Sequence, residues 1–198
     1  MYSDPVGPLA RYQGLQPPTI VLITHAHGDH YEQRTVDALA TPTTRLVVPQ
    51  VVYDGLPEAM RARASLLHNG QSADLGGFAV EALPMYNTTP DRQKYHVKSV
   101  GNGYVLTIAD RRVYIAGDTE DIPEMRALKS IDLAFLPMNL PYTMTGQQAA
   151  SAARAFRPKV VYPFHYTNGP EPADFRAELA GDKDIEVRLR DWYTDPVA

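Results

Sequence analysis

The sequence predicts an α/β domain in which strands and helices alternate along one chain. Its 198 residues are enough to bury a sizeable core, and we expect residues 1–198 to form a single domain. Hydrophobic residues make up 44% and charged residues 21%, as in ordinary globular proteins. Short apolar runs rich in β-branched residues alternate with helical patterns, an order typical of layered domains whose loops at the strand ends carry the chemistry.

Eight apolar segments have the composition of buried strands. In chain order they are Thr19–Thr24, Arg45–Pro49, Phe78–Pro84, Tyr104–Ala109, Arg112–Ala116, Asp132–Pro137, Lys159–Phe164 and Ile185–Leu189. Only Asp110 and Arg111 separate the fourth segment from the fifth. We therefore expect these two strands to form a hairpin.

Five segments between the strands carry helical signals. They are Glu32–Ala40, Pro57–Leu67, Pro123–Lys129, the segment from Thr145 to the residue before Pro158, and Pro172–Ala180. Pro57 suits a first helical turn, and it is followed by Met60, Ala64 and Leu67 on one face. Thr145 and Gln148 have the spacing of a capping box.

Composition excludes several classes of protein. The net charge of -4 provides no basic field for nucleic acid or anionic lipid. The chain has no cysteine, which excludes disulfides, thiolate metal ligands and a cysteine nucleophile. No apolar run approaches the roughly 20 residues of a membrane helix. We expect a small-molecule partner, neither nucleic acid nor membrane, and a cytoplasmic location.

The strongest chemical signal follows the first predicted strand, where the sequence reads HAHGDH. Imidazole is the commonest protein ligand for metals, and crowded imidazoles beside a carboxylate are costly to bury without a cation. His25 and His27 alternate, so both point from one side of an extended segment. Gly28 permits a turn that directs Asp29 and His30 to a second position. The pattern favours a metal site over a solvated polar turn.

This motif, H-x-H-x-D-H after a hydrophobic strand, resembles the signature of the metallo-β-lactamase-fold hydrolases. Asp4-Pro5 resembles the Asp-Pro that closes an early strand in that family. Gly117-Asp118-Thr119 resembles the motif whose aspartate bridges two metals, and Pro163–Tyr166 resembles the motif with the final histidine ligand. The resemblance spans residues 4–166 and implies a four-layer αβ/βα sandwich, with the metals at one rim of two packed sheets.

Within this superfamily, the stretch Asn139–His165 is most similar to lactonase-type and uncharacterised metal-dependent hydrolases related to ascorbate-6-phosphate lactonase. The resemblance implies one or two divalent metal ions. A set of imidazoles and carboxylates without sulfur suits Zn first, and also Mn, Fe or Ni. The resemblance implies that His25 and His27 bind the first metal and that Asp29, His30 and His165 bind the second. Asp118 would bridge the two metals. Asp29 would also orient the nucleophile and pass a proton to the leaving group.

One departure from the family pattern concerns the third histidine of the first metal. It normally follows the strand that corresponds to Phe78–Pro84, but here the sequence continues Met85-Tyr86-Asn87. His96 either replaces it from a loop or is a surface histidine, and Asn87 or Tyr86 could supply an oxygen ligand or hold a water. Tyr86, Asn87 and Tyr142 are candidates for the substrate pocket, with loop or core packing as the alternative.

A second departure concerns the start of the chain. The family usually has two or three strands before its Asp-Pro, so the sequence reads as N-terminally short and lacking the first strands of the fold. An uncovered sheet edge is an association surface. We therefore expect one of two outcomes. Either the chain self-associates as a homo-oligomer, or its first residues are rearranged and Asp4 is displaced from the metal site. If Asp4 is not displaced, it is a candidate partner that orients a histidine.

The resemblance implies a hydrolase that uses a metal-bound hydroxide on an ester, lactone, amide or phosphodiester. The acidic charge balance argues against long nucleic acids as substrates. Two other functions stay open. A mononuclear iron oxygenase of the same fold is compatible with an incomplete first metal site. A non-catalytic remnant that binds metal without turnover is compatible with both departures.

Overall fold

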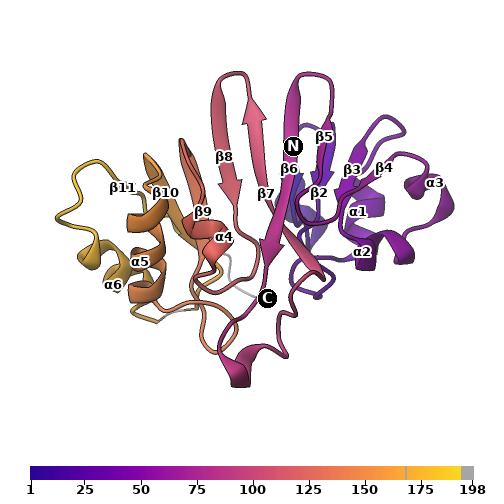
Figure 1. The fold of residues 1–198 in the computed structure, drawn as a ribbon. Coiled ribbons are helices and arrows are strands. Elements are labelled where there is room, and N and C mark those ends of the chain that lie inside the picture. The colour runs from indigo at the N-terminus through magenta and orange to yellow at the C-terminus, as the bar shows by residue number, and fades with distance from the viewer. Residues whose placement is uncertain (168, 193–198) are drawn as a thin grey trace.

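The computed structural model describes residues 1–167 and 169–192. Two sheets face each other and helices cover their outer faces (Figure 1). The smaller sheet has four parallel strands, which in spatial order are β1 (Tyr2–Ser3), β2 (Ile20–Leu22), β3 (Arg45–Val48) and β4 (Ala64–Leu66). Strand β1 thus lies at one edge of this sheet, and its register places Tyr2 beside Val21.

The larger sheet has seven strands of mixed direction. In spatial order they are β11 (Glu186–Val187), β10 (Val160–Phe164), β9 (Leu133–Pro137), β8 (Arg111–Ile115), β7 (Gly101–Ile108), β6 (Phe78–Met85) and β5 (Ser72–Asp74). Strands β8 to β11 run parallel, whereas β5 to β8 are antiparallel neighbours. The expected hairpin is confirmed, because β7 and β8 pair antiparallel with Ile108 opposite Arg111.

Helices lie on the outer face of each sheet (Figure 1). Beside the smaller sheet these are α1 (Gln33–Leu39), α2 (Gln50–Gly55) and α3 (Glu58–Arg61), and beside the larger sheet α4 (Pro123–Arg126), α5 (Gly146–Phe156) and α6 (Glu171–Glu178). Two short 3-10 helices, η1 (Leu9–Tyr12) and η2 (Pro90–Arg92), lie in loops. Thr145 caps α5 with the reciprocal bonds of a capping box to Gln148, as predicted.

Alternation along the strands creates the four layers. In β2, Ile20 and Leu22 pack between the sheets, while Val21 packs outward against the helices α1 to α3. In β7, Tyr104 faces the inner core and Val105 faces the core under α4 to α6. Side chains on successive strand residues point to opposite faces, so each sheet buries both of its surfaces. The αβ/βα sandwich expected from the sequence is confirmed.

All eight predicted strands are present, but the predicted helix Pro57–Leu67 is wrong in its second half. The helix α3 ends at Arg61, and Ala64–Leu66 forms β4. The backbone of β4 pairs with β3, where Val48 lies opposite Leu66. Unpaired strand amides are costly in a sheet, so this pairing outweighs a helical pattern supported by three apolar positions.

Close approach of the two sheets fixes the backbone beside the predicted site. The Tyr104 hydroxyl is fully buried and donates a 2.8 Å hydrogen bond to the Ile23 carbonyl in the other sheet. A Cβ on Gly101 would lie 3.1 Å from the His25 Cβ, and one on Gly117 would lie 3.2 Å from the Thr24 Cβ. Gly117 also has φ +64, a conformation that L side chains rarely adopt. These glycines let the first residue of β7 and the residues just after β8 lie against the segment that follows β2.

No helix among residues 1–167 and 169–192 is long and apolar enough to span a bilayer.

Candidate metal centre

Five loops meet at one rim of the sandwich, and each begins where a strand ends. The strands are β1, β2, β6, β8 and β10. Their loops carry Asp4, the segment 25–30, His96, Asp118 and His165. Parallel strands have their carboxyl ends at the same edge of a sheet, and this explains how residues far apart in sequence gather here.

The first group of side chains consists of His25, His27 and His96. One nitrogen from each lies within 4.8 Å of the other two. His25 Nε2 is 3.1 Å from His27 Nδ1. His25 and His96 are buried and His27 is exposed. The structure therefore brings His96 to the two imidazoles that the sequence pattern left without a third.

The second group consists of Asp29, His30 and His165, again with one atom of each within 4.8 Å. His165 Nε2 lies 3.2 Å from Asp29 Oδ2 and 3.2 Å from Asp118 Oδ2. The backbone of His165 has φ 52, in the left-handed region. A non-glycine residue there costs about 1–3 kcal/mol, and such strain is found at functional sites.

Asp118 lies between the two groups. Its Oδ1 is 3.4 Å from His30 Nε2, and its Oδ2 is 3.4 Å from His96 Nε2. The Asp118 side chain is buried on the short loop that follows β8. One carboxylate thus contacts an imidazole of each group, the position expected of a bridging ligand.

The outward-facing nitrogens of three imidazoles are held by neighbouring oxygens. His30 Nδ1 lies 2.9 Å from Asp4 Oδ2, His25 Nδ1 lies 3.0 Å from Thr24 Oγ1, and His96 Nδ1 lies 3.1 Å from the Tyr142 carbonyl. A carbonyl or carboxylate oxygen accepts only, so the network assigns the proton of neutral His30 and His96 to Nδ1. Their Nε2 atoms then face the cluster, where a bound metal ion would take the place of a proton.

Asp4 is not displaced from the site, so that expectation from the sequence is wrong. Its Oδ1 accepts a 2.7 Å bond from the Thr24 amide, and its Oδ2 accepts a 2.6 Å bond from the Thr24 hydroxyl. Together with the contact to His30, these bonds fix both carboxylate oxygens. Asp4 therefore orients His30, as the alternative interpretation predicted.

A cation fits this arrangement. Among the described residues, three buried atoms that face the cluster make no hydrogen bond, namely His30 Nε2, His96 Nε2 and Asp118 Oδ1. Buried polar atoms without partners cost about 1–3 kcal/mol each, and native proteins rarely leave them so. Imidazole nitrogens and carboxylate oxygens suit Zn, Fe, Ni or Mn. The buried atoms without hydrogen bonds and the types of ligand atom both indicate a site for a divalent metal ion.

The electrostatics of the cluster are dominated by its carboxylates. Burial disfavours charge on His30, but contact with Asp118 and Asp4 outweighs burial and raises the pKa of His30 to about 11. Burial and the neighbouring His30 lower the pKa of His25 to about 2. Burial of Asp118 opposes its charge, yet the close imidazoles hold its pKa well below the ordinary value. The hydrogen bond with an imidazole lowers the pKa of Asp29 to about 2. Both carboxylates are therefore ionised at neutral pH.

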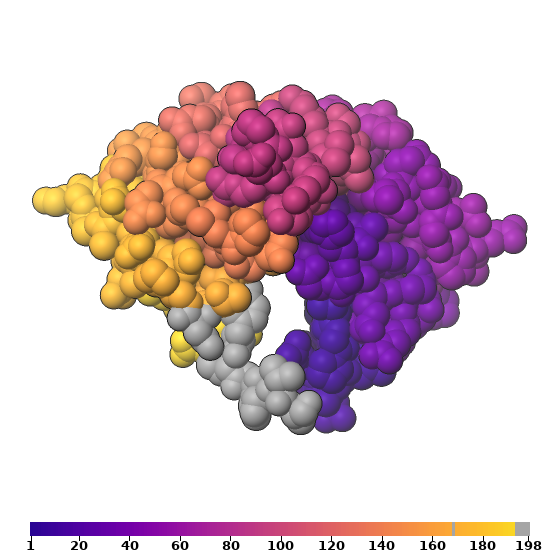
Figure 2. Space-filling view, turned by 90° about the horizontal axis from the view of Figure 1, so that it is seen from below, coloured from indigo at the N-terminus to yellow at the C-terminus, as the bar shows by residue number. Residues whose placement is uncertain are grey.

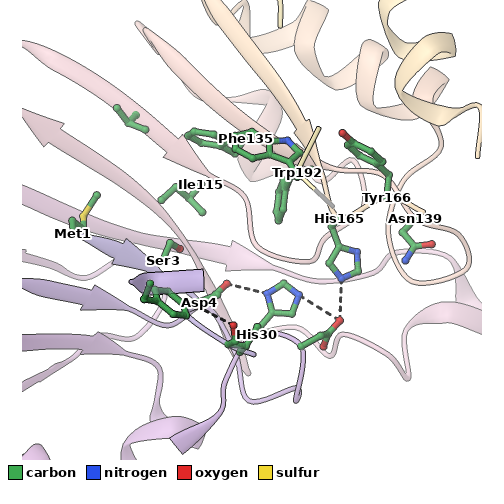
Figure 3. Close-up of a pocket in the computed structure, with 15 residues that line it drawn as sticks. Met1, Ser3, Asp4, His30, Ile115, Phe135, Asn139, His165, Tyr166 and Trp192 are labelled. Carbon is green, nitrogen blue, oxygen red and sulfur yellow. Dashed lines mark hydrogen bonds and ion pairs between the residues drawn. The ribbon is translucent and has the colours of Figure 1, made fainter. Parts of the chain in front are cut away.

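A cavity of about 770 Å³ opens beside the second group. His30 and His165 lie at one end of it, and Phe135 and Trp192 contribute to an apolar wall (Figure 3). Asp29 also lines this cavity. Viewed from below, the molecule is hollowed between the indigo N-terminal segment and the orange segment (Figure 2). A smaller cavity of about 240 Å³ lies beside the first group. Small molecules can therefore reach both groups.

The three residues predicted from the sequence for a substrate pocket lie outside these two cavities. The Asn87 amide is buried and donates to the Arg92 and Tyr142 carbonyls. The Tyr86 hydroxyl donates to Glu124 at 2.9 Å. Tyr142 is exposed, with its ring against Tyr95. The structure gives Asn87 and Tyr86 packing and hydrogen-bonding roles, which was the other interpretation of the sequence.

Three residues near the cluster, Glu120, Arg92 and Thr24, belong to no motif that predicted a role for them. Glu120 is 1% exposed and forms an ion pair with Arg92, and Thr24 lies against His25 and Asp4. Thr24 and Glu120 are each close in sequence to predicted ligands. This proximity is the sequence signal that could have indicated a role for them at the site. The partner of Glu120 lies 28 residues away (120 − 92), in a loop without a regular pattern.

Comparisons with known proteins identify the family of this chain. Residues 3–166 match a family model described as the beta-lactamase superfamily domain. A metal-dependent hydrolase from Thermococcus onnurineus is 32% identical over 181 residues, which cover 86% of this chain and 78% of that protein. Another from Deinococcus radiodurans is 31% identical over 180 residues, which cover 88% and 78%.

Solved structures resemble the fold over nearly the whole chain. One protein from Parabacteroides distasonis, named as a metal-dependent hydrolase, superposes with a TM-score of 0.85 and 42% identity, covering 96% of this chain and 83% of that chain. A metallo hydrolase from Ignicoccus hospitalis superposes with a TM-score of 0.74 and 25% identity, covering 92% and 80%. The diiron β-hydroxylase CmlA from Streptomyces venezuelae, at 17% identity and a TM-score of 0.68, shares the fold, with 95% of this chain and 49% of that chain covered.

Proposed function

Because this chain belongs to the beta-lactamase superfamily, we propose that it is a metal-dependent hydrolase that cleaves an ester, lactone, amide or phosphodiester bond in a small molecule. One observation carries the proposal. The Nε2 atoms of His30 and His96 and Oδ1 of Asp118 are buried, make no hydrogen bond and converge on one rim of the fold, in a chain whose relatives are named as metal-dependent hydrolases. The fold alone would not support it, since one fold hosts many chemistries.

The residues divide into two proposed ligand sets. One consists of His25, His27 and His96, the other of Asp29, His30 and His165, and Asp118 is shared. Bound divalent ions, Zn before Mn, Fe or Ni, would lower the pKa of water to roughly 7 and polarise a carbonyl or phosphoryl oxygen. Asp4 and Thr24 keep the imidazoles of the two sets in the required orientation.

Asp29 is the proposed catalytic group. Its side chain is 63% exposed and lines the larger cavity, within 3.2 Å of His165. Its pKa of about 2 keeps it ionised at neutral pH, so it can accept a hydrogen bond from the attacking water and orient it. With metal bound, Asp29 would accept the proton of that water and give it to the leaving group as the bond between the leaving group and the substrate breaks.

The apolar wall of the larger cavity supports a preference among substrates. Ile115, Phe135 and Phe164 line the same space as His30 and Asp29. Apolar walls with a few polar groups at one end bind the apolar part of a ligand and orient its reactive part. The proposed substrates therefore carry an apolar group next to the scissile bond.

The test is hydrolysis and metal content measured together on the zinc-loaded chain and on His165→Ala. We expect turnover of p-nitrophenyl esters or bis-p-nitrophenyl phosphate, and loss of both turnover and bound zinc in the variant. His68→Ala is the matched control, since His68 is exposed and lies outside the ligand groups. Equal metal content in wild type and His165→Ala would contradict the assignment. Full metal occupancy without turnover would favour a binding remnant, and tightly bound iron with thiol-dependent oxygen uptake would favour an oxygenase.

A further inference from the structure

His96 is the proposed ligand that lies farthest along the chain from the strand that precedes it, and His30 is next, 8 positions after β2 (30 − 22). His96 follows the last residue of β6 by 11 positions (96 − 85), whereas Asp118 follows β8 by 3 positions (118 − 115) and His165 follows β10 directly. A rigid strand therefore places Asp118 and His165, but it cannot place His96. The loop 86–100 must be held by contacts of its own for His96 to meet His25 and His27.

The Glu120 carboxylate binds residues in the first half of this loop. Its Oε2 accepts hydrogen bonds from the backbone amides of Thr88 and Thr89, both at 2.7 Å, and from the Thr88 hydroxyl at 2.8 Å. Its Oε1 lies 3.0 Å from Arg92 Nη1. The Glu120 amide donates to the Tyr86 carbonyl at 3.0 Å. This carboxylate is 1% exposed, and the hydrogen bonds of its Oε2 and the ion pair of its Oε1 join it to residues of this loop.

A second set of hydrogen bonds connects Arg92 in this loop to His96. The Arg92 carbonyl accepts from Asn87 Nδ2 at 3.0 Å, and the same amide group donates to the Tyr142 carbonyl at 2.8 Å. The Asn87 amide N–H donates to the His96 carbonyl at 2.9 Å. The Tyr142 carbonyl also lies 3.1 Å from His96 Nδ1. Asn87 therefore holds both the backbone of His96 and the oxygen that orients its ring.

We propose that Glu120, through its ion pair with Arg92 and its bonds to Thr88 and Thr89, is the positioning residue that places His96 in the first metal site. The inference rests on the proposed metal-dependent function. In the part of the chain that the structure describes, the partners of the Glu120 side chain are Thr88, Thr89 and Arg92, none of them a proposed ligand, and Glu120 is two residues after Asp118 (120 − 118). One short segment thereby fixes both the shared carboxylate and the loop that supplies the third imidazole.

Zinc binding by Glu120→Gln is the direct test, measured by equilibrium dialysis and elemental analysis. We expect wild type to bind two zinc ions and the variant to lose affinity for one of them by about 10–100-fold, as when a partner of a metal ligand is removed. The other ion should bind as before, which general loss of stability would not produce. Glu186→Gln is the matched control, because Glu186 on β11 pairs with Arg188 at 2.6 Å, outside the loop 86–100.

Two further variants separate positioning from folding. Arg92→Gln breaks the same ion pair from its other side and should weaken the same zinc ion if Glu120→Gln fails to fold. The double variant Glu120→Gln/His96→Ala should bind zinc no more weakly than His96→Ala alone, because the two residues act as one unit. Unchanged binding in both single variants, or additive losses in the double variant, would overturn the role of Glu120. No zinc uptake by wild type would overturn the proposed function as well, so the two failures are distinguishable.

Discussion

The substitution Asp4→Asn tests whether the start of the chain serves the metal site. Asp4 Oδ2 lies 2.9 Å from His30 Nδ1 and accepts from the Thr24 hydroxyl at 2.6 Å, while Oδ1 accepts from the Thr24 amide at 2.7 Å. The amide of asparagine keeps one acceptor and has nearly the same size. Its NH₂ group cannot accept the His30 proton, so the proton shifts to Nε2 or the ring turns, and the lone pair no longer faces Asp118.

The expected loss is a 10–100-fold weaker affinity for one metal ion, equivalent to about 1.4–2.7 kcal/mol. Competition between the protein and a chromophoric zinc chelator measures this at constant pH and ionic strength. Asp54→Asn is the matched control, since Asp54 is exposed and accepts a bond from Gln50 on α2. Affinities within a factor of two in wild type and Asp4→Asn would refute the reasoning that Asp4 sets the His30 tautomer.

Three further predictions concern other parts of the molecule. His96→Ala should abolish binding of one of two zinc ions in elemental analysis, whereas the exposed His68→Ala should not; two retained ions would remove His96 from the site. Asp132 accepts from Lys159 and from the Arg112 amide, which lowers its pKa from 3.8 to about 2, so its stabilising charge is present above about pH 4 and is lost as the pH falls towards 2. The difference in urea midpoint between wild type and Asp132→Asn should shrink over that range, and a constant difference would contradict it. Strand β1 is a sheet edge, and Met1 and Trp192 are exposed. Light scattering should therefore detect self-association that increases with protein concentration, and a monomer at every concentration would contradict this prediction.

Much of the fold was predictable because its signals are local. Residues 20–24 of the run TIVLIT are buried on both faces of their sheet, and residues 160–164 of KVVYPF alternate buried with half-buried side chains, so their apolar, β-branched composition identifies strands without knowledge of their neighbours. The capping box of Thr145 and Gln148 likewise lies within four residues. Ala64–Leu66 has no such signal, since it becomes a strand only because the edge of β3 is available for pairing. The sequence pattern around Met60 could not reveal that edge.

In the candidate site, too, the residues with local sequence signals were predictable and the others were not. His25, His27 and His30 follow one strand closely, and their spacing alone indicated a shared site. The place of His96 depends on Glu120, Asn87 and the Tyr142 carbonyl, which come from three separate parts of the chain. No short pattern encodes such an arrangement. For the same reason, the orienting role of Asp4 and the inward packing of Asn87 required the three-dimensional structure.

The central claim is that this rim of the fold holds two metal ions on two ligand sets that share Asp118. An anomalous difference map from crystals of the zinc-loaded chain, recorded above and below the zinc absorption edge, tests it most directly. We predict two peaks, one ligated by His25, His27 and His96 and the other by Asp29, His30 and His165. A map without peaks at this rim, or with His96 turned away from an occupied first site, would contradict the account.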